Sequence, residues 1–217
     1  MSGIHISDKL ISFLTFLPIF FISISVHEFA HAFIANMFGD DTAKNMGRLT
    51  LNPFKHADLI GTYIMPLASF ASGFALIGWA KPVPVKRSNF KDPYKDDAIV
   101  SFAGPASNFI LAILFFIAFV TVLKGGPEQS KYLINFLWYG VFLNIFLFAF
   151  NLIPLPPLDG SYILFDLFPN KYTAQILRLG IYGSILLMFL IYSPLWGYFM
   201  NFINLILSLL LKIAGLG

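Results

Sequence analysis

Long apolar stretches separated by short polar ones dominate the chain. Six of these stretches approach the roughly 20 apolar residues that an α-helix needs to cross a bilayer. They are residues 9–38, 60–79, 98–123, 132–153, 174–192 and 195–214. The pattern therefore predicts an all-α polytopic membrane protein with about five to six transmembrane helices.

The second stretch differs from the others because Pro66, Ser69, Ser72 and Gly73 interrupt its middle. Irregular backbone at membrane depth is tolerated only where it is buried in protein or lines a wet cavity. We expect residues 60–79 to form a re-entrant or broken hairpin. A crossing helix followed by an extended return through a protein-lined cleft would give the same end points.

The polar connections on either side of this stretch favour extended structure. In Lys81-Pro82-Val83-Pro84-Val85-Lys86, two prolines at alternating positions exclude a helix and are typical of an edge strand. Leu49 to Leu51 also has the character of a short strand that ends in a turn. We therefore expect short β strands on one side of the membrane.

Composition agrees with a membrane protein and excludes several classes. The chain is 58% hydrophobic and only 12% charged, whereas soluble domains are about 25% charged. The chain has no cysteine, which rules out disulfides, thiolate metal ligands and cysteine nucleophiles. Its net charge of +3 indicates orientation in a membrane and not nucleic-acid binding. The first stretch lacks the features of a cleaved signal, so we expect it to be a retained helix.

The first apolar stretch contains His27-Glu28-Phe29-Ala30-His31. Ionisable groups inside a bilayer are costly and indicate a functional site by default. Residues four apart lie on one face of a helix, so both imidazoles can bind one metal ion, with Glu28 beside them as a base. The alternatives are a pair of hydrogen-bonded core histidines and a proton relay in a transporter.

A third metal ligand is expected from the segment that follows the fourth stretch. Three prolines between residues 154 and 157 must break the helix, and Asp159-Gly160 follows at once. Alone, Asp159 would be read as the N-cap of a helix starting at Tyr162. Because the histidine pair lacks a third ligand, we favour Asp159 as that ligand. Two imidazoles and a carboxylate suit one zinc ion best, although cobalt or iron would also be accepted.

Membrane topology offers a test of this ligand set. Asp159 can join the histidines only if the first and fourth stretches end on the same side, which requires the second stretch to turn back. That side then holds 11 of the 14 basic residues and is cytoplasmic by the positive-inside rule. These residues are Lys44, Arg48, Lys55, Lys81, Lys86, Arg87, Lys91, Lys95, Lys171, Arg178 and Lys212, against Lys9, Lys124 and Lys131 on the other side.

The chemistry that these residues favour is amide hydrolysis. Three protein ligands leave a fourth zinc position open for water, and Glu28 would take the proton of that water and pass it to the leaving amine. The leading interpretation is a zinc endopeptidase. The alternatives are a metal or ion transporter that uses the same site and a catalytically silent membrane scaffold. A transporter has no evident need for Glu28.

Three motifs in this order resemble the site-2 protease family of intramembrane zinc metalloproteases, in its short prokaryotic branch without a PDZ domain. They are HEFAH at residues 27–31, SFAGPASN at 101–108 and FNLIPLPPLDG at 150–160. The segments GRLTLNPFKHAD and GWAKPVPVK also resemble parts of that branch. The resemblance covers roughly residues 20–170.

The resemblance implies zinc ligands at His27, His31 and Asp159, a catalytic base at Glu28, and an Asn151 that orients the substrate or stabilises the oxyanion. It implies cleavage of transmembrane segments of other proteins, as in regulated intramembrane proteolysis. We expect a single membrane-embedded domain, with a core at about 9–170 and two accessory helices in 174–217. The expected location is the prokaryotic cell (inner) membrane, with the active site opening toward the cytoplasm and no oligomeric state implied.

Three further expectations concern individual segments. The small residues of 101–107 are interpreted as helix-packing positions, and Asn108 is expected to hydrogen-bond a neighbouring helix or a site loop. His56 is expected to bind a loop carbonyl in preference to facing the site. An edge strand at Val83 to Lys86, or at Leu49 to Leu51, could hold an unwound substrate by strand addition.

Overall fold

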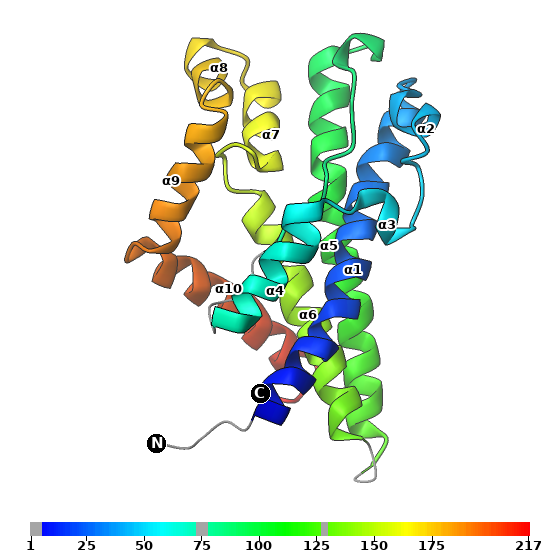
Figure 1. Cartoon of the computed structure of the whole chain (residues 1–217), viewed down its shortest axis with the longest axis vertical. Coiled ribbons are helices and arrows are strands. Elements are labelled where there is room, and N and C mark those ends of the chain that lie inside the picture. Colours follow the sequence, from blue (N-terminus) through cyan, green and yellow to red (C-terminus); the bar gives the residue numbers. More distant parts are fainter. Residues whose placement is uncertain (1–5, 73–77, 127–129) are drawn as a thin grey trace.

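The computed structural model describes residues 6–72, 78–126 and 130–217, and the regular secondary structure in these ranges is helical (Figure 1). No strand occurs in these ranges, so the predicted short β strands are wrong. The elements in chain order are α1 (Ile6–Met37), α2 (Thr42–Asn45), α3 (Pro53–His56), the π-helix η1 (Leu59–Ile64), α4 (Met65–Ser72), the 3-10 helix η2 (Arg87–Asn89), α5 (Pro93–Lys124), α6 (Lys131–Asn151), α7 (Asp159–Leu167), α8 (Lys171–Leu177), α9 (Ile181–Ile191) and α10 (Leu195–Ile213).

Three long helices, α1, α5 and α6, pack together and form the centre of the molecule. The main apolar core lies between α5, α6 and α10, where Ala112, Val141 and Ile145 are fully buried. A second cluster joins α1 to α6. Within the described residues, four helices are long and apolar enough to cross a membrane, and the bent pair α8–α9 makes up to five. The polytopic prediction is confirmed, with four to five spans where five to six were expected.

The second apolar stretch turns back on itself. Its first half is helical as η1 and α4, and its last residues return to the start. Trp79 N donates to Gly61 O at 3.0 Å, and Thr62 Oγ1 donates to Trp79 O at 2.8 Å. A Cβ at Gly61 would lie 2.4 Å from the Trp79 ring, so glycine is needed for this approach. The predicted return is confirmed for its two ends, while residues 73–77 lie outside the described range.

The proline segment, residues 81–86, is extended but does not pair as a strand. Pro82 and Pro84 have no N–H to donate, and the neighbouring donors are used locally. Lys81 N donates to His56 O at 2.8 Å, and Lys86 N donates to the buried Asp40 Oδ2 at 2.7 Å. A side chain and the carbonyl at the end of α3 therefore take the place of a ladder partner, which explains why the strand prediction fails here.

The C-terminal helices run differently from the simple crossings expected of them. Gly180, at φ +50°, lies between α8 and α9. The axes of these two helices are bent by 83° relative to each other. With 11 residues, α9 is about 16 Å long, roughly half the thickness of a hydrocarbon core. The following α10 packs on α6 through Trp196 against Phe146 and Phe150.

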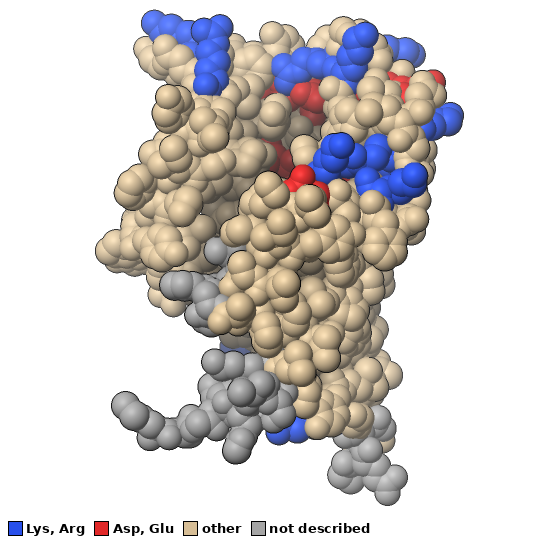
Figure 2. Space-filling model, viewed as in Figure 1, with Lys and Arg blue, Asp and Glu red and all other residues tan. Residues whose placement is uncertain are grey.

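Basic residues gather at one end of the molecule. Figure 2 shows Lys and Arg concentrated around α2, α8 and the start of α5 on the visible face, with acidic atoms in the hollow beneath them. Lys212 is an exception to the predicted distribution, because Lys124 Nζ donates to Ala214 O at 3.0 Å at the opposite end. The prediction for Lys212 is wrong because the short α9 leaves α10 to run toward that opposite end instead of returning to the basic one.

Candidate metal centre

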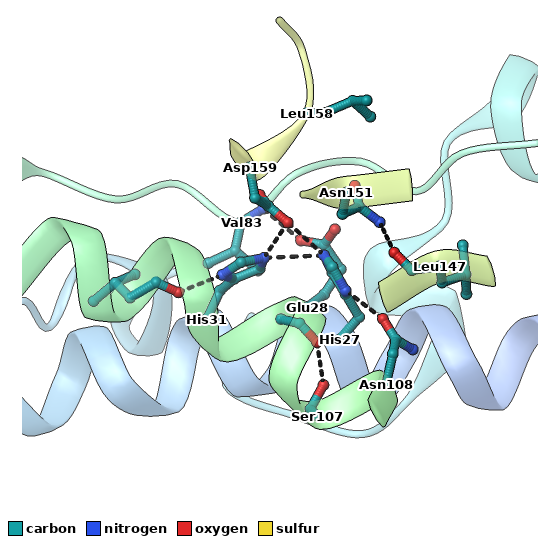
Figure 3. A network of polar contacts seen from close by, with 12 residues as sticks. His27, Glu28, His31, Val83, Ser107, Asn108, Leu147, Asn151, Leu158 and Asp159 are labelled. Carbon is teal, nitrogen blue, oxygen red and sulfur yellow. Dashed lines mark hydrogen bonds and ion pairs between the residues drawn. The ribbon is translucent and has the colours of Figure 1, made fainter. Parts of the chain in front are cut away.

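The two motif histidines lie on the face of α1 that packs against α5. Both rings are buried, and their Nε2 atoms are 3.0 Å apart. Asp159, the first residue of α7, places Oδ2 at 3.2 Å from His27 Nε2 and 3.5 Å from His31 Nε2 (Figure 3). The helical spacing thus brings the pair together as predicted, and the chain after α6 brings Asp159 to it from 128 residues beyond His31.

Both imidazoles present a lone pair to the centre. His31 Nδ1 lies 2.7 Å from the backbone oxygen of Val100, which can only accept, so the proton is on Nδ1 and Nε2 has a free lone pair. His27 Nδ1 lies 2.6 Å from Asn108 Oδ1, which is likewise an acceptor. Such outer partners are the usual means of orienting a metal-binding histidine. The expectation that Asn108 bonds a neighbouring helix is confirmed, and its partner is a site residue.

Three acceptor atoms therefore face one another with no hydrogen between them. A cation at their centre would offset the repulsion between their lone pairs. Asp159 Oδ2 is buried and has no hydrogen-bond donor, because neither Nε2 carries a proton toward it. The separations of 3.0–3.5 Å match the roughly 3.3 Å between ligands of a tetrahedral zinc with bonds of about 2.0–2.1 Å. His27, His31 and Asp159 thus fit a zinc ion in both chemistry and spacing.

Gly104 on α5 keeps the space among these ligands open. A Cβ at this position would lie 2.3 Å from His31 Nε2 and 2.6 Å from His27 Nε2. Any side chain would therefore occupy the place of the ion. Sequence reasoning assigned Gly104 only to helix packing; its position directly before Pro105 within a long helix gave no sign of this role.

Gly160 determines where Asp159 lies. A Cβ on Gly160 would lie 2.4 Å from Leu152 O and 2.6 Å from Ile153 O, so glycine lets α7 begin directly against the end of α6. The helix starts at Asp159, with Leu158 at the N-cap, and not at Tyr162 with Asp159 as its cap. The N-cap interpretation of Asp159 is therefore wrong.

Glu28 lies beside the cluster without belonging to it (Figure 3). Its carboxylate is buried, and Oε2 accepts a hydrogen bond of 2.8 Å from Val83 N in the proline segment. This bond holds one carboxylate oxygen in place and leaves Oε1 for other contacts. The N–H of Val83 was not anticipated from the sequence as a partner of Glu28.

Two other predicted residues have different surroundings. Asn151, at the end of α6, points its amide at Leu147 and donates to Leu147 O at 3.0 Å (Figure 3); the amide nitrogen has a second N–H that this bond does not use. His56 is fully buried and its Nε2 lies 2.7 Å from Thr50 O. The prediction that His56 binds a loop carbonyl is confirmed.

An ionic cluster joins the helix that carries Asp159 to α5. Arg87 donates to Asp97 on α5 at 2.8 Å through Nε and also contacts Asp166 on α7, while its guanidinium lies 5.2 Å from the Phe165 ring centroid. Burial, and then the nearby Asp97 charge, raise the pKa of Asp166 to about 7. Sequence reasoning assigned Arg87 only to the basic side of the membrane and did not foresee this cluster.

Fold and site together define a helical membrane protein with a buried His-His-Asp group that fits a zinc ion and an adjacent glutamate. Comparison with known proteins agrees: the family model for peptidase family M50 matches residues 15–126 and 119–191. The chain belongs to this family, which confirms the resemblance to site-2 proteases, and it is a zinc metalloprotease. The transporter and scaffold alternatives are not favoured.

Curated relatives carry matching names. The chain is 45% identical over 181 residues to "Putative zinc metalloprotease YwhC" of Bacillus subtilis, covering 82% of this chain and 80% of that protein. It is 33% identical over 142 residues to "Putative zinc metalloprotease Rip2" of Mycolicibacterium smegmatis, covering 64% of this chain and 51% of the relative. No solved structure matches the chain.

Proposed function

We propose that the protein is an intramembrane endopeptidase that hydrolyses peptide bonds within transmembrane segments of other membrane proteins. The observation that carries the proposal is the meeting of His27, His31 and Asp159, with ligand atoms within 4.8 Å of one another, inside a bundle of membrane-length helices. Substrate segments reach such a site from the bilayer. Because helix amides are hydrogen-bonded to one another, the segment must unwind locally before it is cut.

In this proposal His27, His31 and Asp159 hold the zinc ion. Zinc, when bound, supplies Lewis-acid polarisation of the scissile carbonyl and makes a water molecule more acidic. Glu28 Oε1 takes the proton of the attacking water while Val83 N–H holds Oε2. As the C–N bond breaks, Glu28 gives that proton to the leaving amine nitrogen.

Asn151 has a supporting part in the same proposal. One N–H of its amide is committed to Leu147 O, which fixes the side chain at the end of α6. The second N–H serves as a donor to the substrate carbonyl, either to orient it or to stabilise the oxyanion. Replacing Asn151 is expected to slow cleavage without changing zinc affinity.

The proposal extends to location and domain organisation. We place the protein in the prokaryotic cell membrane, with the basic end of Figure 2 on the cytoplasmic side by the positive-inside rule. Residues 1–217 form one membrane-embedded protease domain, with the core at about 9–170 and accessory helices in 174–217. The α10 helix supports α6 through an aromatic cluster of Trp196, Phe199 and Phe150.

The decisive experiment measures cleavage of a panel of membrane-inserted model helices by purified protein with stoichiometric zinc. Wild type is expected to cut at least one helix, and Glu28→Gln is expected to bind zinc normally but cut at least about 100-fold more slowly, since a general base contributes that much. Asp41→Asn, which removes an exposed carboxylate outside the motif, is the matched control.

The panel contains helices with and without a helix-weakening residue at the centre, because unwinding is required. The proposal fails if wild type cuts none of them, or if Glu28→Gln cuts as fast as wild type. Cleavage confined to water-soluble peptides would also contradict the membrane-embedded substrate.

A further inference from the structure

A second buried polar residue, Asn144 on α6, connects to the metal centre through Asn108. Both amides are 0% exposed. Asn108 Nδ2 donates to Asn144 Oδ1 at 2.9 Å and to the backbone oxygen of Ser23 at 3.2 Å. Asn144 Nδ2 donates to Gly140 O and to Ser23 Oγ, each at 2.9 Å. The chain of bonds thus runs from α6 through α5 to His27 on α1.

Backbone carbonyls fix the direction of every bond in this chain, because a carbonyl can only accept. Gly140 O requires the NH₂ group of Asn144, which turns Oδ1 of Asn144 toward Asn108. That oxygen, together with Ser23 O, requires the NH₂ group of Asn108. Asn108 Oδ1 is therefore left facing His27 Nδ1, and the imidazole must carry its proton on Nδ1.

The opposite polarity would disable the centre. With its amide reversed, Asn108 would present an NH₂ group to His27 Nδ1, and the ring proton would move to Nε2. That nitrogen is the one that lies 3.2 Å from Asp159 Oδ2, and a protonated nitrogen cannot bind a metal. An asparagine amide is nearly symmetric in shape, so only its hydrogen-bond partners select between these two states.

We propose that Asn144 is a positioning residue of the metal centre, which holds the Asn108 amide in the orientation that keeps His27 Nε2 available to zinc. The inference rests on the proposed function, in which His27 is a zinc ligand. His31 needs no such relay, because its Nδ1 bonds the Val100 carbonyl directly. His27 has no backbone partner at Nδ1, so Asn108 and Asn144 fix the position of its ring proton. For His31 the Val100 carbonyl does this.

The burial of two amides among apolar helices supports a role beyond packing. Burying an amide is costly unless its groups are hydrogen-bonded, and a leucine at position 144 would fill a similar volume without that requirement. Packing alone gives no reason for an amide at this depth. The reason lies in four directional hydrogen bonds, which the amides of Asn144 and Asn108 make to Ser23, to Gly140 and to each other.

Zinc affinity of the purified protein, measured by competition with a chromophoric chelator, tests the relay. Asn144→Leu is expected to weaken zinc binding about 10- to 100-fold, the range found when an outer partner of a metal ligand is lost. Asn135→Leu makes the same chemical change at an exposed position of the same helix and is expected to leave affinity unchanged.

A rescue variant separates the relay from a merely structural role. An aspartate at position 108 has only acceptor oxygens, so its orientation no longer depends on Asn144. Asn108→Asp gives up the two donor bonds to Asn144 Oδ1 and Ser23 O, so its own zinc affinity is the reference for this test. Adding Asn144→Leu to Asn108→Asp is expected to cause no further loss. A loss of the same size in both backgrounds would show that Asn144 acts through packing and would overturn the proposal.

The ¹⁵N spectrum of His27 in metal-free wild type gives a reading that does not depend on any variant being stable. A proton is expected on Nδ1, and a ring protonated on Nε2 alone would contradict the relay. Failure of the two proposals is distinguishable. If zinc binding does not require His27, His31 and Asp159, the proposed function fails; if it does require them but Asn144→Leu binds like wild type, only the relay fails.

Discussion

Gly104 and His31 are so close that a methyl group on Gly104 would lie 2.3 Å from His31 Nε2. This relationship joins two helices at the group that fits a zinc ion. In the proposed function it makes the absence of a side chain on α5 a condition for zinc binding, so we expect a residue outside the motif to affect zinc affinity.

Gly104→Ala is expected to lower zinc affinity at least about 100-fold, the upper end of the effect of losing an outer ligand partner, since the added carbon takes the place of the ion. Alanine favours a helix over glycine by about 1 kcal/mol, so the variant is expected to fold. Titration with zinc measures the affinity of the variant. Gly197→Ala, where nothing lies within 4 Å of the added carbon, is the control, and normal zinc binding by Gly104→Ala would contradict the site.

Val83→Pro removes the N–H that holds Glu28 Oε2 at 2.8 Å. Because a small displacement of a catalytic group costs up to about 100-fold in rate, kcat is expected to fall about 10- to 100-fold while zinc affinity stays unchanged. Val83→Ala retains the N–H and should keep most of its activity. Equal rates for the two variants would show that the hydrogen bond has no part in positioning the base.

Removing zinc is expected to destabilise the protein, because an ion that binds only the folded state stabilises it by about 2.7 kcal/mol at 100 times its Kd. Thermal unfolding in detergent with and without a chelator measures this difference. His31→Ala is expected to lose the response to chelator. His56→Ala removes a buried histidine outside the cluster and should keep it; a response that persists in His31→Ala would place the zinc elsewhere.

Stability is expected to depend on pH through Asp166, whose pKa is raised to about 7 by burial and by the Asp97 charge. The folded protein then retains a proton that the unfolded chain, with a pKa near 3.9, has released. The stabilisation from this proton is complete below about pH 4 and is lost as pH rises through 7. Asp166→Asn should flatten the fall in Tm between about pH 4 and 7.

The control for that series is Asp41→Asn, because Asp41 is an exposed carboxylate. It should leave the pH profile of Tm as in wild type. The other charged or titratable groups that face Asp166 are Asp97, Arg87 and, across the guanidinium, Tyr94. An unchanged profile in Asp166→Asn would assign the pH dependence to groups other than Asp166.

Sequence reasoning succeeded where a local repeat carries the information. The 3.6-residue period placed His27 and His31 on one face of α1 before any tertiary contact was known. The three prolines after Asn151 ended α6, and Asp159, which the sequence offers as a third ligand, does lie beside the two histidines. Segment lengths gave the spanning helices, although the bend at Gly180 was missed because one glycine in an apolar stretch does not reveal a backbone turn of 83°.

The strand prediction failed for a physical reason that lies outside the segment itself. Alternating prolines in residues 81–86 correctly indicated extended backbone. The donors of Val83 and Lys86, however, bond the side chains of Glu28 and Asp40, which are 55 and 46 residues away. A sequence pattern describes the conformation of a segment, but it does not reveal which distant acceptor takes its hydrogen bonds.

By itself, the sequence determined the membrane class, the helical register of the HEFAH motif, and the identity of the ligand and base candidates, because these follow from local periodicity and residue chemistry. Only the tertiary structure decided that Gly104 leaves room for an ion, that Val83 holds Glu28, and that Asn144 sets the polarity of Asn108. Each of these depends on atoms that different parts of the chain bring together. The role of a glycine or an amide is set by those contacts, which the sequence alone does not reveal.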